Sequence, residues 1–394
     1  MTYPGREDPL FSAVKQMVIE TNSSSIVRIQ RKFLIGHERA AAMVAALVDD
    51  GITVQNALDR HFMQRRNISD VPIESQQPLH IKVLGIGGCG INMINYMLAK
   101  GTQGIEFVAL SSDEKELARC KADQRLQLST TQAMPTGNAI VTTPEEDCAR
   151  IKTAMAGADM VFVVAGMGGN TGTSVAPIAA QIARNLGIQT IAVVSMPFAY
   201  EGNRMRRAPL GIKDLFAQTD ALVIIPLEAQ VNKYDMFVSE VFEATNLLMH
   251  FAVVGIAKSL SEASLVSLDI ADLRTLIAGI VTVGTGEATG PDRGKVACEQ
   301  AIASIASTVD FANSSSILVN VAASSSLKLR EIAEIIESVE LIAKDAVIVA
   351  AAAYDDAMKN SLRVTMYCTG PTSPFDVMAA SHYRTITLAP QFHL

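Results

Sequence analysis

Short apolar runs and helical segments alternate along the middle of the chain. Between residues 80 and 275, helical stretches separate β-branched runs such as HIKVLGIG, IEFVALSS, DMVFVVAG, QTIAVVSMP and ALVIIP. Strands that alternate with helices in this way form a parallel sheet covered on both faces. One long helical stretch, residues 237–260, contains no proline. The pattern therefore predicts an α/β domain with a long central helix over residues 79–260.

The regions on either side carry different patterns. Residues 261–371 hold the runs SSILVNVAA, DAVIVAAAAY and LRVTMYCTG around a helical segment near residues 329–339, which predicts a smaller α+β domain. Apolar positions recur at helical spacing in residues 8–72, and the polar stretch 73–78 is typical of a linker. The last residues, 372–394, show no clear periodicity, and we expect them to form a tail.

Composition excludes several classes of protein. With 49% hydrophobic and 19% charged residues, the chain is expected to fold around a core. A net charge of −7 excludes a basic coat for nucleic acid along the whole chain, but not a local patch. The five cysteines never form a C-x-x-C pair, so we predict reduced thiols, a cytoplasmic protein and no metal site. The N-terminus has no secretory pattern, and the most apolar run, residues 346–354, is about half a membrane span. We expect that run to be a core strand, without membrane insertion.

Two glycine-rich loops each connect a predicted strand to a predicted helix. The first is GIGGCGIN at residues 85–92, and the second is GMGGNTGTS at residues 166–174, with its helix expected near residues 175–177. Backbone N–H groups of such loops, together with a helix N-terminus, bind phosphate. The first loop alone also fits a Rossmann fingerprint, and two unconnected turns are an alternative. The second loop lacks the lysine of a P-loop, so the pair indicates one polyphosphate held from both sides.

The two loops and the motifs after them resemble the tubulin/FtsZ superfamily, in particular the FtsZ-type cell-division GTPases. GGNTGTS is similar to the family signature GGGTGTG, with Asn170 and Ser174 in place of glycine. The resemblance continues through MPFAYEG, FEATN, SLDIADLRTL and GTGEATGPDRGKVACEQAI, and it covers roughly residues 80–371. It implies binding of GTP or GDP with Mg²⁺, GTPase activity and head-to-tail polymerisation.

The resemblance also implies roles for particular residues. Asp269 and Asp272 are implied to be catalytic, on a loop that one subunit inserts over the nucleotide of the next. Without the resemblance, the same two aspartates are better explained as the N-cap and first turn of a helix, and only the match of the flanking motifs favours the catalytic role. Glu201, with Arg204 or Arg206, is implied to lie beside the ribose. The full set of implied nucleotide-binding residues is Gly87, Gly88, Cys89, Gly90, Asn92, Gly168, Gly169, Asn170, Thr171, Gly172, Thr173, Glu201, Arg204, Arg206 and Asn246.

Several positions depart from the family pattern. The family's third loop, rich in glycine and alanine, is not recognisable in residues 132–147, and Ile91 replaces a loop glycine. Leu227 and Glu228 stand where the family has Asn and Asp, and Leu247 falls on the aspartate that reads guanine. Leucine cannot accept hydrogen bonds from the guanine edge. We therefore expect phosphate binding to be retained, guanine selectivity to be weakened and hydrolysis to be slow.

The N-terminal region has a resemblance of its own. The stretch SSSIVRIQRKFLIGHERAAAMVAALVDDGI predicts a helix-turn-helix with Gly36 in the turn. It closely resembles the γ domain of FtsK DNA translocases, a winged helix that reads short DNA motifs. The wing is not evident, because VQNALDRHFMQRR has a helical pattern. A small helical module that docks another protein stays an alternative. The candidate DNA-binding residues are Arg28, Arg31, Lys32, His37 and Arg39.

These patterns together predict a nucleotide-driven, FtsZ-like filament protein. The expected partners are further copies of the chain, FtsZ or other division proteins, and DNA through residues 8–72. Two alternatives stay open: a non-hydrolysing relative that regulates or co-assembles with division filaments, and a DNA-segregation filament with a built-in DNA adaptor. An NAD-dependent dehydrogenase fits less well, because the second glycine loop and the SLDIADL segment would then have no explanation.

Overall fold

The chain divides into two compact units, residues 1–77 and residues 78–394. The computed structural model describes residues 10–21, 47, 79–129, 144–230, 236–260, 264–266, 268, 270–306 and 310–370. In the first unit it describes helix α1 (Phe11–Thr21), which buries Phe11 and Val14. The rest of the predicted helix-turn-helix, its five candidate DNA-binding residues and the tail 372–394 lie outside the described residues.

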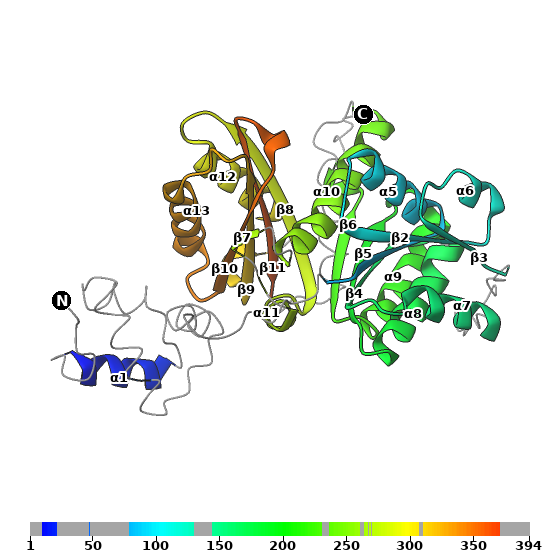
Figure 1. The fold of residues 1–394 in the computed structure, drawn as a ribbon, viewed down its shortest axis with the longest axis horizontal. Helices are drawn as coiled ribbons and strands as arrows, with labels where there is room; N and C mark the ends of the chain where they lie inside the picture. Colours follow the sequence, from blue (N-terminus) through cyan, green and yellow to red (C-terminus); the bar gives the residue numbers. More distant parts are fainter. Residues whose placement is uncertain are drawn as a thin grey trace, which may run out of the picture. The chain divides into compact units, whose positions relative to one another are not determined.

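The second unit is built on one sheet, drawn in Figure 1. Its described strands follow the order β3-β2-β1-β4-β5-β6-β8-β11-β9-β10-β7. The pairings from β3 to β8 are all parallel. The strands of this parallel half are β1 (Ile81–Ile86), β2 (Ile105–Ser111), β3 (Gln124–Gln127), β4 (Met160–Gly166), β5 (Gln189–Met196), β6 (Ala221–Pro226) and β8 (Gly279–Thr289). The predicted α/β class is confirmed.

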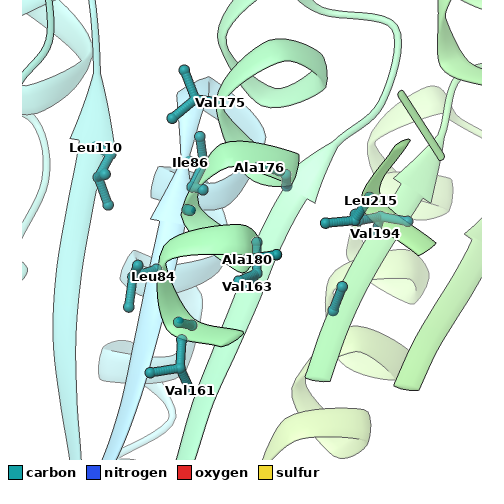
Figure 2. Packing of buried hydrophobic residues seen from close by; sticks show 14 of the residues in the cluster. Leu84, Ile86, Leu110, Val161, Val163, Val175, Ala176, Ala180, Val194 and Leu215 are labelled. Atoms are coloured by element: carbon teal, nitrogen blue, oxygen red, sulfur yellow. The ribbon is translucent and has the colours of Figure 1, made fainter. Parts of the chain in front are cut away.

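Helices cover both faces of the parallel half. The described helices are α5 (Gly87–Ala99), α6 (Glu114–Ala118), α7 (Glu145–Met155), α8 (Asn170–Asn185), α9 (Gly202–Phe216) and α10 (Val238–Ser259), with the 3₁₀ turn η3 (Glu228–Gln230). On one face, α7, α8 and α9 share a single buried cluster with the strands. Figure 2 shows how Ala176 and Ala180 of α8 turn toward strand residues such as Val161 and Val163. Alanine at these buried positions lets the helix lie close to the sheet, which fixes its N-terminus beside the end of β4.

The other half of the sheet forms the smaller α+β domain. There β11 (Ser361–Thr369) pairs antiparallel with β8 and β9 (Ser316–Ala323), and β10 (Val347–Tyr354) lies between β9 and β7 (Ser264–Val266). The accompanying helical elements are α11 (Ile270–Leu276), α12 (Arg293–Ala306), η4 (Phe311–Asn313), α13 (Leu329–Ile342) and η5 (Asp356–Met358). A second buried cluster joins α12 and α13 to these strands. The apolar run 346–354 is thus a strand of this sheet, as predicted.

The long helix α10 connects the two halves. It contacts α5 and β5 of the parallel half and β10 and β11 of the other. The Tyr367 hydroxyl of β11, fully buried, donates to the Phe251 carbonyl of α10 at 2.7 Å. By length and composition, α10 is the one helix in the described part of the chain that could cross a membrane. It packs against strands of both halves of the sheet, as a core helix does.

Candidate functional site

The first glycine loop passes directly from strand to helix. β1 ends at Ile86, and α5 begins at Gly87, whose φ of +69° is accessible to glycine at little cost. The sequence pattern placed the helix start after Asn92, which is wrong by about one and a half turns. Gly88, Cys89 and Gly90 belong to the first turn of α5. Their N–H groups are therefore those that an α-helix leaves without intrahelical partners.

The second loop is also shorter than predicted. β4 ends at Gly166, and α8 begins at Asn170 rather than near residue 175. Gly169 precedes the helix in extended conformation, so small polar residues that have a loop-like pattern form its first turn. Gly168 has a φ of +92°, and a Cβ there would lie 2.6 Å from the carbonyl oxygen of Arg204. The Gly168 N–H donates to Thr173 Oγ1 at 2.8 Å, which ties the turn to the helix.

The two loops meet at one edge of the sheet. β1 and β4 are neighbouring parallel strands, with Ile86 paired to Ala165, so both loops leave the same edge. A Cβ on Gly87 would lie 3.3 Å from the backbone nitrogen of Gly172. Neither α5 nor α8 has an acidic residue in its first turn or a side-chain cap. The carboxylate of Glu116 in α6 borders the first loop, because a Cβ on Gly88 would lie 2.5 Å from its Oε1, and that carboxylate accepts a 2.7 Å bond from Ser111. Two uncapped helix N-termini converge beside it, and their free N–H groups suit an anion such as phosphate.

Polar side chains that the sequence patterns did not single out border this site. Ser112, directly after β2, lies 3.1 Å from the hydroxyl of Thr171. Arg207 of α9 donates from Nη1 to Oδ1 of Asn170 at 2.7 Å. Both contacts depend on the packing of neighbouring elements, and no local motif marks either residue.

The residues expected beside the ribose lie at the start of α9. Glu201 precedes the helix; it accepts the Phe198 N–H at 3.0 Å and a 2.7 Å bond from Arg204. Arg206 is exposed on the same helix. The Glu201–Arg204 pair orders the chain where it leaves β5, next to the strand whose end supports the second loop.

Aromatic side chains adjoin the same edge of the sheet. The rings of Phe198 and Tyr200 stack with centroids 5.0 Å apart, and Phe242 of α10 meets Phe198 edge-on at 6.3 Å. Phe242 is 47% exposed. Asn246, four residues further along α10, falls on the same helix face. Phe242 and Asn246 thus present a partly exposed ring and an amide on one face of α10, next to Phe198 after the end of β5.

The structure describes the surroundings of three residues that depart from the family pattern. Leu227 is buried with Phe198 and Val241, so it serves the core. Glu228 accepts the backbone N–H of Ala199 through its carboxylate. Leu247 lies half-buried on α10, where it brings no acceptor to the aromatic group.

Cys89 of the first loop is a packed thiol. Its sulfur lies 3.4 Å from Ser195 Oγ at the end of β5. Burial raises the pKa of the thiol, which the Ser195 hydrogen bond only partly offsets. The side chain thus stays protonated near neutral pH and leaves its backbone N–H as the group available to a ligand.

Asp272 lies at the opposite edge of the sheet from the glycine loops. It is in the first turn of α11, and Arg274 of that helix donates to Gln189 at the start of β5, at 2.5 Å. Ser195, beside the first glycine loop, is six residues further along β5, or about 20 Å at 3.3 Å per residue. Asp269 is outside the described residues. Within one subunit, Asp272 is therefore on the far side of the sheet from the anion site.

A fold of this type, with two glycine loops at the carboxyl edge of a parallel sheet, defines a nucleotide-binding protein. The model of the Tubulin/FtsZ family GTPase domain matches residues 80–235, and that of the FtsZ family C-terminal domain matches residues 279–372. The FtsK gamma domain matches residues 5–60.

Curated relatives and solved structures agree with these matches. The cell division protein FtsZ of Coxiella burnetii is 39% identical over 308 residues, which cover 75% of this chain and 80% of that protein. FtsZ of Neisseria meningitidis serogroup B is 37% identical, covering 77% of this chain and 81% of that protein. A mutant FtsZ of M. jannaschii superposes with a TM-score of 0.69 at 30% identity, covering 80% of this chain and 96% of the other. The chain therefore belongs to the FtsZ family of tubulin-like GTPases, and the resemblance found in the sequence is confirmed.

Proposed function

We propose that the chain binds GTP between its two glycine loops and assembles head to tail into filaments that hydrolyse it at each subunit junction. The observation that carries this proposal is the separation of Asp272 from the loops by the length of β5. A group at one edge of the sheet acts on a nucleotide at the other edge only if a second copy supplies it. An FtsZ dimer from M. jannaschii, 29% identical with a TM-score of 0.66, supports self-association as the route.

The phosphates would be held by backbone N–H groups of both loops. Gly88, Cys89 and Gly90 on one side and Asn170 to Gly172 on the other begin helices without acidic residues. Mg²⁺ suits this arrangement, because it commonly binds through substrate phosphates and keeps several waters. The described residues contain no cluster of three or more His, Cys, Asp or Glu that would hold a metal on its own. When bound, the ion would neutralise charge on the phosphates.

The base would lie against the aromatic group. Phe242 exposes part of its ring, and Asn246 is the polar side chain one turn further along the same face. Leu247 removes the carboxylate that would distinguish guanine. We infer that GTP is bound with a smaller preference over ATP than in the rest of the family.

Hydrolysis would require Asp269 and Asp272 of the neighbouring subunit. Two carboxylates three residues apart at a helix start share one face, and they can orient and polarise a water. The altered third loop and Leu247 support slow turnover. A non-hydrolysing relative that co-assembles with division filaments, including FtsZ itself, is the alternative that a rate of zero would favour.

The test is phosphate release by the full chain with GTP and Mg²⁺ over a range of protein concentrations. A site made of two subunits predicts a rate that rises more steeply than linearly with concentration. Asp272→Ala should abolish turnover and leave GTP affinity within a few fold. A rate that is linear in protein and unaffected by Asp272→Ala would contradict a shared site.

A second function is favoured by the match to the FtsK gamma domain at residues 5–60. We propose that this unit lets the filament bind DNA in the cytoplasm through Arg28, Arg31, Lys32, His37 and Arg39. Single units would bind weakly, and repetition along a filament would raise avidity by roughly 10²–10⁴. Co-sedimentation of DNA with the full chain, with and without GTP, tests this against a chain starting at Leu79. Equal DNA recovery from both chains would instead favour docking of a protein partner.

A further inference from the structure

A side-chain contact at the mouth of the second glycine loop has no counterpart in the family signature. Residue 170 is asparagine where the signature has glycine, and its Oδ1 accepts a 2.7 Å hydrogen bond from Nη1 of Arg207. Both residues are exposed, so the contact lies at the surface of the site. Glycine at position 170 could not make this bond, so the asparagine creates the contact.

The packing of α9 against the loop directs Arg207 toward this position. The backbone of Arg204, one turn earlier, contacts Gly168 so closely that a Cβ on that glycine would lie 2.6 Å from the Arg204 carbonyl oxygen. One turn later, Gly211 faces Thr173 of α8, where an added Cβ would lie 2.4 Å from the threonine methyl. Arg207 lies between these two contacts on the same helix face. Its guanidinium is therefore held over the first turn of α8.

A cation is unfavourable at this place unless an anion joins it. The N-terminus of α8 carries about half a positive charge, and its first turn has no acidic residue to offset Arg207. A guanidinium has five N–H donors in a planar fork, and the bond to Asn170 uses one of them. The fork matches two oxygens of a phosphate. The charge and the donors both point to an anionic ligand directly in front of the helix.

We propose that Arg207 binds the terminal phosphate of a nucleoside triphosphate, and that Asn170 is the positioning residue that holds the guanidinium in place. The proposal rests on the proposed nucleotide site and deepens it. Arg207 makes the site sensitive to the third phosphate, so the chain prefers triphosphate over diphosphate through one side chain of its own subunit.

The experiment measures the affinities of the full chain for GDP and for the slowly hydrolysed analogue GTPγS by calorimetry with Mg²⁺. Arg207→Ala should weaken GTPγS binding about tenfold and GDP binding less than twofold, because charged hydrogen bonds to one phosphate are lost. Arg207→Lys should restore part of the loss. Lys213→Ala, which removes an exposed positive charge further along α9, is the matched control and should change neither affinity.

A double-mutant cycle tests the role of Asn170. Asn170→Gly should weaken GTPγS binding about threefold in the natural chain and have no further effect in the Arg207→Ala background. Equal losses for GDP and GTPγS in Arg207→Ala would overturn the proposal, and so would unchanged affinities. If the natural chain binds neither nucleotide, the proposed nucleotide site itself fails, which is a different result.

Discussion

Two variants that are each inactive should regain activity when they are mixed. The first is Asp272→Ala, which keeps its glycine loops. The second is Gly169→Asp, which keeps Asp272. Gly169 is the residue before α8, with φ −75° and ψ 165°, and a Cβ there would meet only the Gly166 carbonyl oxygen at 4.0 Å. An aspartate fits at that place and is favourable for the helix, by about 0.5 kcal/mol.

The same aspartate should eliminate nucleotide binding. It puts a carboxylate at the helix N-terminus, where the proposed phosphates lie. Two unit charges of one sign 4 Å apart near a protein surface repel by about 4 kcal/mol, or roughly 1000-fold in affinity. Gly169→Asp should therefore lose nucleotide while its melting temperature is unchanged or slightly raised. That combination separates loss of the site from loss of the fold.

In an equal mixture, active junctions form only between unlike subunits. An intact pair of loops comes from the Asp272→Ala chain, and an intact Asp272 comes from the Gly169→Asp chain. With random head-to-tail order, about one quarter of all junctions combine the two, so the rate should reach about one quarter of that of the natural chain. Within one chain the 20 Å separation forbids such rescue.

The assay is phosphate release from GTP by each variant alone and by the mixture, with co-sedimentation to verify that both enter one polymer. Glu299→Ala, which removes an exposed carboxylate from α12, replaces Asp272→Ala in the control mixture and should be active by itself. If the two variants share a polymer and the mixture still releases no phosphate, the shared site is refuted. Activity of Asp272→Ala alone would refute the role of that residue.

Three further predictions follow from single side chains. Leu247→Asp should raise the preference for GTP over ATP in competition binding by roughly tenfold, because the new carboxylate accepts from the guanine edge; an unchanged ratio would contradict this. Burial, with nearby cations, lowers the pKa of His250 to about 4 from 6.5, so stability present above pH 6.5 is lost as pH falls, by about 3 kcal/mol at pH 4. The free energy of unfolding, measured with urea above pH 6.5 and at pH 4, should fall less in His250→Phe than in the natural chain. Arg31→Ala and Arg39→Ala should weaken DNA co-sedimentation and leave GTP affinity unchanged.

The strands could be predicted from the sequence because their residues are apolar and buried on both faces of the sheet. Runs such as DMVFVVAG are β-branched and apolar on both faces, as a strand buried between two helical layers requires, and β4 is buried along nearly its whole length. The convergence of the two loops followed from the same reasoning, since neighbouring parallel strands end at one edge. No side-chain contact had to be known for either conclusion.

The helix starts and the polar border of the site could not be predicted. Asn170 and Gly172 have poor helix propensity and suggest a loop, yet close packing of α8 on the sheet decides the conformation. The contact between Asn170 and Arg207 joins residues 37 apart through the packing of α8 against α9. Leu227 shows the converse, because only its burial beside Phe198 explains a leucine at that position.

The two edges of the parallel sheet differ in charge, and this difference favours head-to-tail contact. Each helix that follows a strand starts at the carboxyl edge with its positive end and finishes at the amino edge with its negative end. α8 starts beside the glycine loops, and Asn185 ends it shortly before Gln189 begins β5 at the other edge. Bound phosphates would oppose this attraction unless Mg²⁺ offsets their charge, and loss of one phosphate would change that balance. A junction between unlike edges is therefore one whose strength depends on the nucleotide, which is the property that a filament driven by hydrolysis needs.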